Sequence, residues 1–251
     1  MQILHRLPLD KIYFMDLLIQ HAKTLFGLDI NPTQLAMFQK YADELTAWNT
    51  HTNLTAIIEP QAVAIRHFLD SLSLMPLLKM DVPQKAIDVG TGAGFPGLVL
   101  AIIAPQIHIT LLEATGKKIK FLEHVISILG LKNATTLHAR AEDAGQMPNQ
   151  RGKYDVVMAR AVARLPALVE YMLPLAKIGG VCIAMKGITA QDEVTDSGRA
   201  LKILGGHFDK IETVMLPTIE EAHHLVVITK TGKTPPDYPR KPGIPTKKPI
   251  S

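Results

Sequence analysis

Apolar residues in the first 80 positions of the chain recur at helical spacing. They return every three or four positions over residues 10–28 and again over residues 59–78, as on the buried face of an amphipathic helix. Between these stretches Asn31 stands before Pro32, which is typical of an N-cap followed by proline at the first helical position. The pattern therefore predicts a helical N-terminal region.

The pattern changes at Lys85, where short apolar runs rich in β-branched residues begin to alternate with helical stretches. We expect strands at 85–90, 107–113, 134–139, 154–161 and 179–187, and helices at 96–104, 115–130, 164–176 and 190–204. Such alternation predicts βαβ units and a doubly wound, mostly parallel sheet. The last two apolar runs, 207–215 and 223–230, have little helical pattern between them and are expected to pair antiparallel at the sheet edge.

The C-terminal segment has a different composition, with six prolines between Thr231 and Ser251. Proline lacks a backbone N–H and favours extended chain, so we expect this tail to be extended or disordered rather than helical. The chain then divides into an N-terminal helical extension (1–82), a ligand-binding domain (83–230) and a Pro-rich tail (231–251).

Composition narrows the class of protein. With 47% hydrophobic and 20% charged residues, the chain is typical of a soluble globular protein. It has no apolar run near the ~20 residues of a membrane span, and its first 14 residues lack a signal-peptide core. The single cysteine, Cys182, permits no internal disulfide and no multi-cysteine zinc site. We therefore expect a cytoplasmic protein without a membrane contact and without a metal.

Positive charge is concentrated at the C-terminus. The net charge is +4, and residues 230–251 hold six Lys or Arg and one Asp, a local +5 that leaves −1 for the rest. A basic terminal arm is therefore expected.

A glycine-rich loop follows the first expected strand, in "AIDVGTGAGFPGLVLAI" (86–102). A strand, a glycine turn and a helix N-terminus form a nucleotide-binding geometry, because glycine lets a ligand approach the backbone. The spacing Gly92-x-Gly94-x-x-Gly97 fits a dinucleotide site, whereas Asp88-x-Gly90-x-Gly92-x-Gly94 fits the loop that binds S-adenosyl-L-methionine (AdoMet). A turn without a ligand is the third alternative.

Two acidic positions favour AdoMet. Asp88 precedes the first glycine, where a carboxylate suits the amino group of AdoMet but would repel a pyrophosphate. "AED" (141–143) follows the third strand, where adenine can be held. Glu113 ends the second strand, where a carboxylate accepts hydrogen bonds from ribose hydroxyls in either alternative.

Several motifs together resemble one family, the RsmG (GidB) methyltransferases of a guanine N7 in bacterial 16S rRNA. The resemblance rests on the glycine loop, "TLLEATGKKIKFLEHV", "RAED", "YDVVMARAVARL", "MKG" and the tail "TPPDYPRKPGIPTKKP". It implies a class I AdoMet-dependent methyltransferase fold. It also implies that the protein is a monomer and that its partner is 16S rRNA or the small ribosomal subunit. The positions that match its AdoMet contacts are Gly90, Phe95, Glu113, Ala114, Thr115, Ala141, Glu142 and Arg160, and we add Asp88 and Gly92 from the loop pattern.

The residues around the expected site agree with guanine N7 as the methyl acceptor. N7 already carries an in-plane lone pair, so the enzyme needs neither a general base nor a covalent nucleophile, and Cys182 is expected to be a core residue. Arg160 and Arg164 lie where the fourth strand ends, and Lys186 lies at the same end of the fifth. We expect Arg160 and Lys186 to be catalytic. An NAD-type oxidoreductase and a non-catalytic RNA-binding protein remain alternatives.

Overall fold

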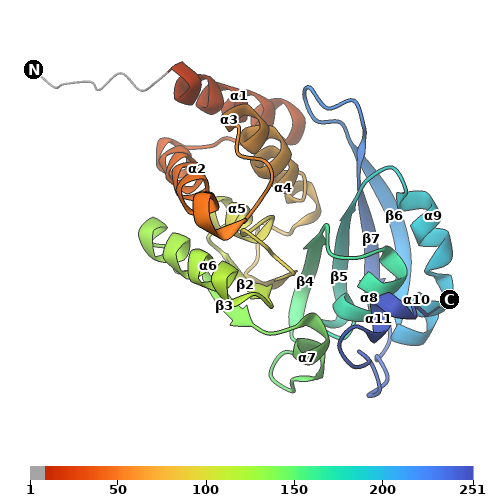
Figure 1. Cartoon of the computed structure of the whole chain (residues 1–251). Coiled ribbons are helices and arrows are strands. Elements are labelled where there is room, and N and C mark those ends of the chain that lie inside the picture. Colours follow the sequence, from red (N-terminus) through yellow and green to blue (C-terminus); the bar gives the residue numbers. More distant parts are fainter. Residues whose placement is uncertain (1–8, 251) are drawn as a thin grey trace, which may run out of the picture.

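The fold is built on a seven-stranded sheet, seen in a computed structural model that describes residues 9–250 and the side chains from residue 16 onward (Figure 1). The opening residues 1–8, used above to argue against a signal peptide, and Ser251 lie outside the described residues. The strands are β1 (Gln84–Val89), β2 (Ile107–Glu113), β3 (Ala134–His138), β4 (Tyr154–Arg160), β5 (Ala176–Lys186), β6 (Gly206–Val214) and β7 (His223–Lys230).

The strand order is β3-β2-β1-β4-β5-β7-β6, and β1 to β5 run parallel. Strand β7 is antiparallel to both β5 and β6. The predicted doubly wound sheet and its antiparallel edge pair are therefore confirmed. The order reverses at β1, which lies between β2 and β4, and open sheets of this kind bind ligands beyond the carboxyl ends of the strands at that point.

Helices cover both faces of the sheet. The N-terminal segments are α1 (Leu9–Phe26), α2 (Pro32–Thr52), α3 (Pro60–Val63), the π-helical turn η1 (Ala64–Leu69), α4 (Asp70–Leu72) and the 3-10 turn η2 (Met75–Leu77). The later helices are α5 (Gly97–Ile103), α6 (Gly116–Leu129), α7 (Ala141–Gln146), α8 (Leu165–Met172), α9 (Ala190–Asp196) and α10 (Gly198–Leu204). The N-terminal helices, α5 and α6 share one hydrophobic core, and α8, α9 and α10 share the other.

Local signals explain where several helices begin and end. The Asn31 side chain accepts a hydrogen bond from Gln34 N, and the Gln34 side chain accepts one from Asn31 N. This capping box confirms the predicted start of α2. The expected helix at 190–204 is interrupted, because α9 ends at Asp196 and α10 begins at Gly198. The short helix α7 was not predicted.

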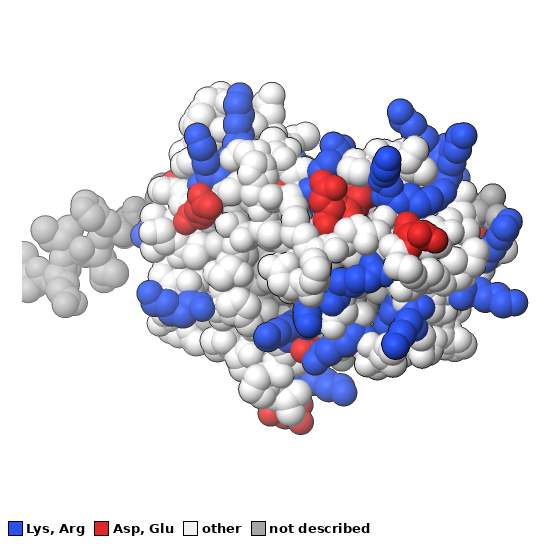
Figure 2. All heavy atoms as spheres, turned by 90° about the horizontal axis from the view of Figure 1, so that it is seen from below, with Lys and Arg blue, Asp and Glu red and all other residues white. Residues whose placement is uncertain are grey.

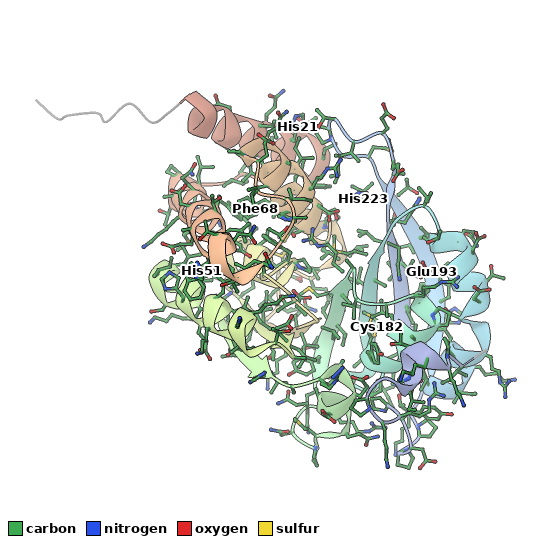
Figure 3. All side chains as sticks on the ribbon, viewed as in Figure 1. His21, His51, Phe68, Cys182, Glu193 and His223 are labelled. Carbon is green, nitrogen blue, oxygen red and sulfur yellow. The ribbon has the colours of Figure 1, made fainter. Side chains whose placement is uncertain are left out.

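The two cores account for the alternation of side chains along the strands. In β4, Met158 faces the core under the N-terminal helices and Val157 faces the core under α8. Cys182 of β5 lies in the second core, within the sheet layer (Figure 3). Burial raises the pKa of its thiol to about 12, so Cys182 is an inert core residue, as predicted.

The expectation of an extended or disordered tail is wrong. Residues 232–250, which we call the C-terminal strap, pack against α7 and α8 and contain a helical turn, α11 (Ile244–Lys247). The Arg151 guanidinium donates to the carbonyl oxygens of Gly145, Thr234, Pro235 and Tyr238 at 2.6–3.0 Å. A side chain from outside the strap thus satisfies carbonyls that a proline-rich chain cannot pair by itself.

On the face of the molecule seen from below Figure 1, Lys and Arg side chains are scattered among residues of other kinds, and acidic side chains are fewer (Figure 2). Within residues 9–250, no helix is long and apolar enough to cross a bilayer. The same described residues hold no cluster of three or more His, Cys, Asp or Glu that is arranged to bind a metal ion.

Candidate functional site

The glycine loop connects β1 to α5 at the carboxyl edge of the sheet. Gly90, Gly92 and Gly94 all have positive φ angles, of 69°, 62° and 101°, which side chains rarely adopt. A Cβ on Gly90 would lie 2.8 Å from Val162, and one on Gly94 would lie 2.6 Å from the Tyr41 hydroxyl. A Cβ on Gly92 would meet nothing nearer than 4.0 Å. Gly92 is therefore the one of the three that faces an opening, where a ligand can approach the backbone.

Asp88 lies beneath this loop and is fully buried. Its Oδ2 accepts hydrogen bonds from the Thr91 hydroxyl at 2.6 Å and from Gly97 N at 2.8 Å. Its Oδ1 is buried without a partner. Burial raises the pKa of the Asp88 carboxyl to about 6, against the lowering effect of the two hydrogen bonds and of Arg160. An unpartnered carboxylate oxygen at this place suits a cationic group of a ligand.

Glu113 ends β2 beside the same loop. Its Oε2 accepts a hydrogen bond from Gly92 N at 3.1 Å, and its Oε1 accepts one from Thr115 N at 2.8 Å. Each carboxylate oxygen has a further lone pair available for a hydroxyl group. Glu113 and Gly92 lie 21 residues apart in the chain, and the structure brings them together as the sequence pattern predicts. Ala114 and Thr115 are exposed next to them.

Ala141 and Glu142 open α7, which follows β3. The Glu142 side chain is buried and accepts a hydrogen bond from Gly243 N of the strap at 2.8 Å. Arg140, Ala141 and Glu142 form the start of a short helix, and Ala141 is partly exposed. The strap thus fixes the segment that we expect to hold adenine, and the contact of Ala141 and Glu142 with AdoMet stays a prediction.

Arg160 ends β4 and forms the centre of a network with η1 and α4. Its Nη1 donates to Arg66 O at 2.8 Å and to Asp70 Oδ2 at 3.0 Å, and its Nη2 lies 3.2 Å from His67 Nδ1. Because a guanidinium only donates, His67 Nδ1 accepts. Burial, followed by the Arg160 charge, lowers the pKa of His67 to about 4. His67 is therefore neutral near pH 7.

Phe95 joins this network to the glycine loop. The His67 ring stacks on Phe95 with 4.3 Å between ring centroids, and Tyr41 of α2 stacks on Phe95 at 5.3 Å. The Arg160 guanidinium lies 5.1 Å from the same ring centroid. Tyr41 also donates a hydrogen bond to Ala93 O in the loop. The N-terminal helices thus support the loop, a role that the sequence did not indicate for Tyr41.

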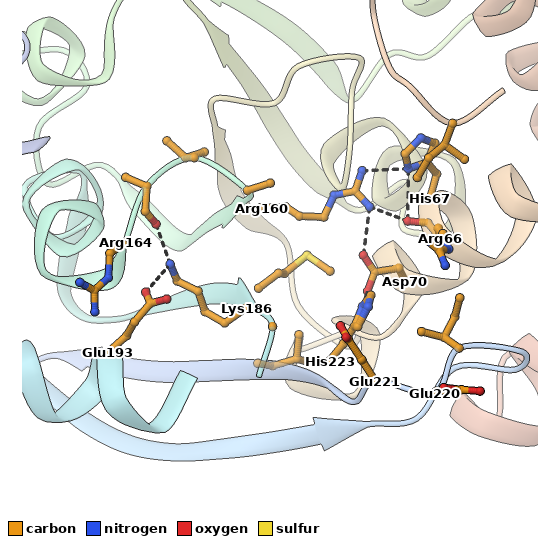
Figure 4. Close-up of a pocket in the computed structure, with 18 of the residues that line it drawn as sticks. Arg66, His67, Asp70, Arg160, Arg164, Lys186, Glu193, Glu220, Glu221 and His223 are labelled. Atoms are coloured by element: carbon orange, nitrogen blue, oxygen red, sulfur yellow. Dashed lines mark hydrogen bonds and ion pairs between the residues drawn. The ribbon is translucent and has the colours of Figure 1, made fainter. Parts of the chain in front are cut away.

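A cavity of about 1090 Å³ opens beside the loop, at the carboxyl ends of β4 and β5 (Figure 4). It begins at Arg160 and Val162 and is bounded by the β6–β7 connection, including Glu220 and Glu221. Lys186 lies in its wall, where Nζ donates to Ala163 O at 2.6 Å and pairs with Glu193 Oε2 at 2.7 Å. A catalytic role for Lys186 stays a prediction, and this pairing suits a residue that holds the wall in place.

Two further residues of the cavity were missed or assessed differently from the sequence. Asp70 was given no role from the sequence. His223 was also given no role, and its ring and that of His224 lie on opposite faces of β7. His223 Nδ1 lies 2.8 Å from Asp70 Oδ1, whereas His224 Nδ1 lies 3.2 Å from the Thr213 hydroxyl. The signal for His223 was its position at a strand start near the carboxyl edge of the sheet.

The arrangement fits AdoMet. The open backbone at Gly92 permits close approach of the cofactor. The carboxylate of Glu113 beside it suits the ribose hydroxyls, and the unpartnered Asp88 oxygen suits the positive amino group. The adjoining cavity provides room for a methyl acceptor. Fold and site together define a class I AdoMet-dependent methyltransferase.

Comparison with known proteins identifies the family. The model of the GidB family, described as rRNA small subunit methyltransferase G, matches residues 34–226. A ribosomal RNA small subunit methyltransferase G from Roseiflexus castenholzii is 48% identical over 236 residues, covering 94% of this chain and 100% of the relative. One from Desulforamulus reducens is 44% identical over 233 residues, covering 93% and 97%. The chain belongs to the rRNA small subunit methyltransferase G family.

Solved structures agree at the level of fold. TYW2 from M. jannaschii in complex with AdoMet has a TM-score of 0.50 and 14% identity, covering 64% of this chain and 74% of that one. TYW2 from P. horikoshii in complex with MeSAdo has a TM-score of 0.51 and 13% identity, covering 65% and 62%. These comparisons confirm three expectations from the sequence: the family, the AdoMet-dependent class of enzyme and the fold. They set aside the two alternatives, an NAD-type oxidoreductase and a non-catalytic RNA-binding protein.

Proposed function

We propose that this protein transfers a methyl group from AdoMet to N7 of a guanine in 16S rRNA. The observation that carries the proposal is the junction at Arg160–Val162, where the glycine loop meets the cavity. A cofactor held by the loop and a base held in the cavity would meet there. Membership of the rRNA small subunit methyltransferase G family supports rRNA as the substrate.

AdoMet would be held by residues from three strand ends. Glu113 would accept hydrogen bonds from the ribose hydroxyls, Gly92 would allow close approach, and Asp88 would attract the amino group. Ala141 and Glu142 would contact the adenine. Bound AdoMet would supply an electrophilic methyl group on its sulfonium sulfur, open to in-line attack by a nucleophile with the thioether S-adenosylhomocysteine as the leaving group.

His67 is not available as a general base, which is compatible with an acceptor that needs no deprotonation. His67 is neutral, and both its ring nitrogens are engaged, Nδ1 with Arg160 and Nε2 with the Thr55 hydroxyl at 2.9 Å. It is therefore not placed to take a proton from a substrate. Guanine N7 presents a lone pair directly, so alignment is the main contribution that the protein makes. Arg160, fixed by Asp70 and Arg66 O, would hold the methyl-transfer end of the site.

The mouth of the cavity suits RNA. The Arg164 side chain is 68% exposed and pairs only with the exposed Asp196 among the described residues, and Arg66 is also exposed. Exposed guanidinium groups bind phosphates bidentately. We infer that the protein acts as a monomer in the cytoplasm, on 16S rRNA or on the small ribosomal subunit.

The test is methyl transfer from labelled AdoMet to small subunits and to 16S rRNA that lack the modification. Mass spectrometry of the digested RNA should find N7-methylguanosine and no other methylated nucleoside. Arg160→Ala should lower turnover at saturating AdoMet at least a hundredfold. It should also lower stability, because the buried Asp70 loses its cation, so turnover is measured at a temperature at which thermal unfolding shows the variant to be folded, and calorimetry sets the saturating AdoMet concentration. Label on an atom other than guanine N7 would contradict the proposal. Turnover of Arg160→Ala within twofold of wild type would contradict the role of Arg160.

A further inference from the structure

Selecting guanine at N7 is a chemical problem that the reaction itself does not solve. Adenine carries the same N7 lone pair, so the choice must be made at other atoms of the base. Beside N7, guanine presents the acceptor O6 where adenine presents an amino donor. A site that places a hydrogen-bond donor without an accepting lone pair next to this position would bind O6 of guanine. With adenine, the same donor would face the donor N–H of the 6-amino group, which is unfavourable. This reasoning rests on the proposed function.

Most cations around the cavity are already engaged. Lys186 is held by Glu193 and Ala163 O. Arg164 pairs with Asp196 at the exposed mouth. Arg160 distributes its donors over Arg66 O, Asp70 and His67. Arg66 is exposed on η1, where a flexible guanidinium suits a phosphate better than a single base atom.

His223 is placed differently. It begins β7 and lines the cavity, and its side chain is 32% exposed. Nδ1 is 2.8 Å from Asp70 Oδ1, while Asp70 Oδ2 binds Arg160 at 3.0 Å. The Asp70 carboxylate is buried, and Figure 4 shows Arg160 and His223 approaching it from separate elements. His223 Nε2 makes no hydrogen bond within the part of the chain that the structure describes.

Asp70 determines what Nε2 offers to a ligand. Asp70 bonded to Arg160 is an ionised acceptor, so the proton of the shared hydrogen bond stays on His223 Nδ1. Nε2 is then a donor when the ring is protonated and an acceptor when it is neutral. The hydrogen bond to Asp70 raises the pKa of His223, while burial and the charges of Arg160 and Arg66 lower it. Glu220 and Glu221 are the other charged groups of the β6–β7 connection that border the same cavity.

We propose that His223, oriented by Asp70, donates a hydrogen bond from Nε2 to O6 of the target guanine and thereby selects guanine over adenine. The neutral ring offers a lone pair instead, which repels O6 and accepts from the adenine amino group. Guanine selection therefore depends on the protonated form of His223.

The experiment compares His223→Gln, His223→Arg and the control His224→Gln, whose ring lies on the opposite face of β7 and contacts Thr213. The substrate is a small subunit reconstituted with guanine, hypoxanthine or adenine at the target position. The kcat/KM of methyl transfer is measured between pH 6 and 8.5 at saturating AdoMet, and AdoMet affinity is measured by calorimetry. Hypoxanthine keeps O6 and lacks the 2-amino group, so it isolates the contact to O6.

In wild type and in His224→Gln, kcat/KM on guanine should fall as pH rises through the His223 pKa, because the donor is lost. His223→Arg keeps a permanent cation and should show no such fall. His223→Gln should lose about 10- to 150-fold near pH 6, the size of one charge-assisted hydrogen bond, and should discriminate less against adenine. Hypoxanthine should react as guanine does, and AdoMet affinity should be unchanged in all variants.

The inference is overturned if His223→Gln keeps the wild-type kcat/KM and pH profile, or if hypoxanthine is not methylated while guanine is. The second result would place recognition at the 2-amino group. Failure of the proposed function is distinguishable, because wild-type protein would then bind AdoMet but methylate none of the three RNAs at N7.

Discussion

Arg240 of the C-terminal strap forms an ion pair with Glu170 of α8, with 2.7 Å between Nη2 and Oε2, and the Glu170 carboxylate has no exposed surface. Arg240 N and Nε also donate to Glu170 Oε1, at 2.7 and 3.0 Å. A buried charge with this many donors is stable only while its partner is present. The strap is therefore part of the folded core rather than an arm added to it.

Arg240→Ala should destabilise the protein by about 3 kcal/mol or more, because it leaves the Glu170 charge buried without its cation. The measurement is denaturant unfolding at neutral pH. Lys241→Ala, an exposed strap cation next in the chain, is the matched control and should change stability by less than about 0.5 kcal/mol. Equal effects of the two substitutions would show that the Arg240–Glu170 pair contributes nothing specific.

Deletion of residues 232–251 should also destabilise the protein and weaken AdoMet binding. The deletion removes the partners of Glu170 and of Glu142, and Glu142 lies in the segment expected to hold adenine. Thermal unfolding and calorimetry with AdoMet measure the two effects. A truncated protein with unchanged melting temperature and AdoMet affinity would contradict this role of the strap.

Gly92→Ala should abolish or strongly weaken AdoMet binding. Its positive φ costs a side chain about 1–2 kcal/mol, and the added Cβ points into the opening where the ligand approaches. Gly130→Ala is a matched control, because Gly130 at the end of α6 has φ 64° and also has open space at the Cβ position. Both variants should lose similar stability, and only Gly92→Ala should lose AdoMet affinity in calorimetry. A loss of affinity in both would indicate a general effect on the fold.

Glu113→Gln should lower the affinity for AdoMet and for its demethylated product, S-adenosylhomocysteine, by similar factors, since both ligands carry the same ribose. Loss of one charge-assisted hydrogen bond corresponds to about 1.5–3 kcal/mol. Glu123→Gln, on the exposed part of α6, should leave both affinities unchanged. If Glu113→Gln weakened only one of the two ligands, a contact to the shared ribose could not explain it.

The parts of the fold that the sequence predicted depend on local patterns. Asp88, the loop glycines and Glu113 are identifiable because strand, turn and helix follow each other within 30 residues, and parallel strands bring their carboxyl ends together. The mostly parallel sheet with its antiparallel edge pair and the start of α2 at Asn31 follow from the same kind of signal.

The contacts that were missed join residues far apart in the chain. Asp70 and His223 are separated by 153 positions, and Glu170 and Arg240 by 70. Charge and proline content alone suggested an extended or disordered basic tail. The buried carboxylate that binds Arg240 lies on an otherwise apolar helix, α8, far away in the chain. Which donors meet which acceptors depends on how the layers pack, and no single segment carries that information.

The buried carboxyl of Asp88 should make AdoMet affinity depend on pH. Burial raises its pKa in the free protein to about 6, so the carboxyl is mostly protonated below pH 6 and ionised above it. The positively charged AdoMet favours the ionised form, and binding at lower pH must first release a proton. Affinity should therefore be nearly constant above about pH 6.5 and decrease by up to tenfold for each pH unit below 6. Calorimetry between pH 5 and 7.5 measures this directly.

Asp88→Asn is the variant that isolates the effect, since asparagine can still accept hydrogen bonds from Gly97 N and the Thr91 hydroxyl but does not titrate. It should bind AdoMet more weakly at pH 7.5 and lose most of the pH dependence. The free energy of unfolding of the free protein should depend on pH in the opposite direction to AdoMet affinity. The folded-state pKa lies above the ordinary aspartate value of 3.8, so this group stabilises the free protein below pH 4 and the contribution is lost as pH rises through 6. An AdoMet affinity in wild type that is equal at pH 5 and pH 7.5 would show that the Asp88 charge does not act on the cofactor.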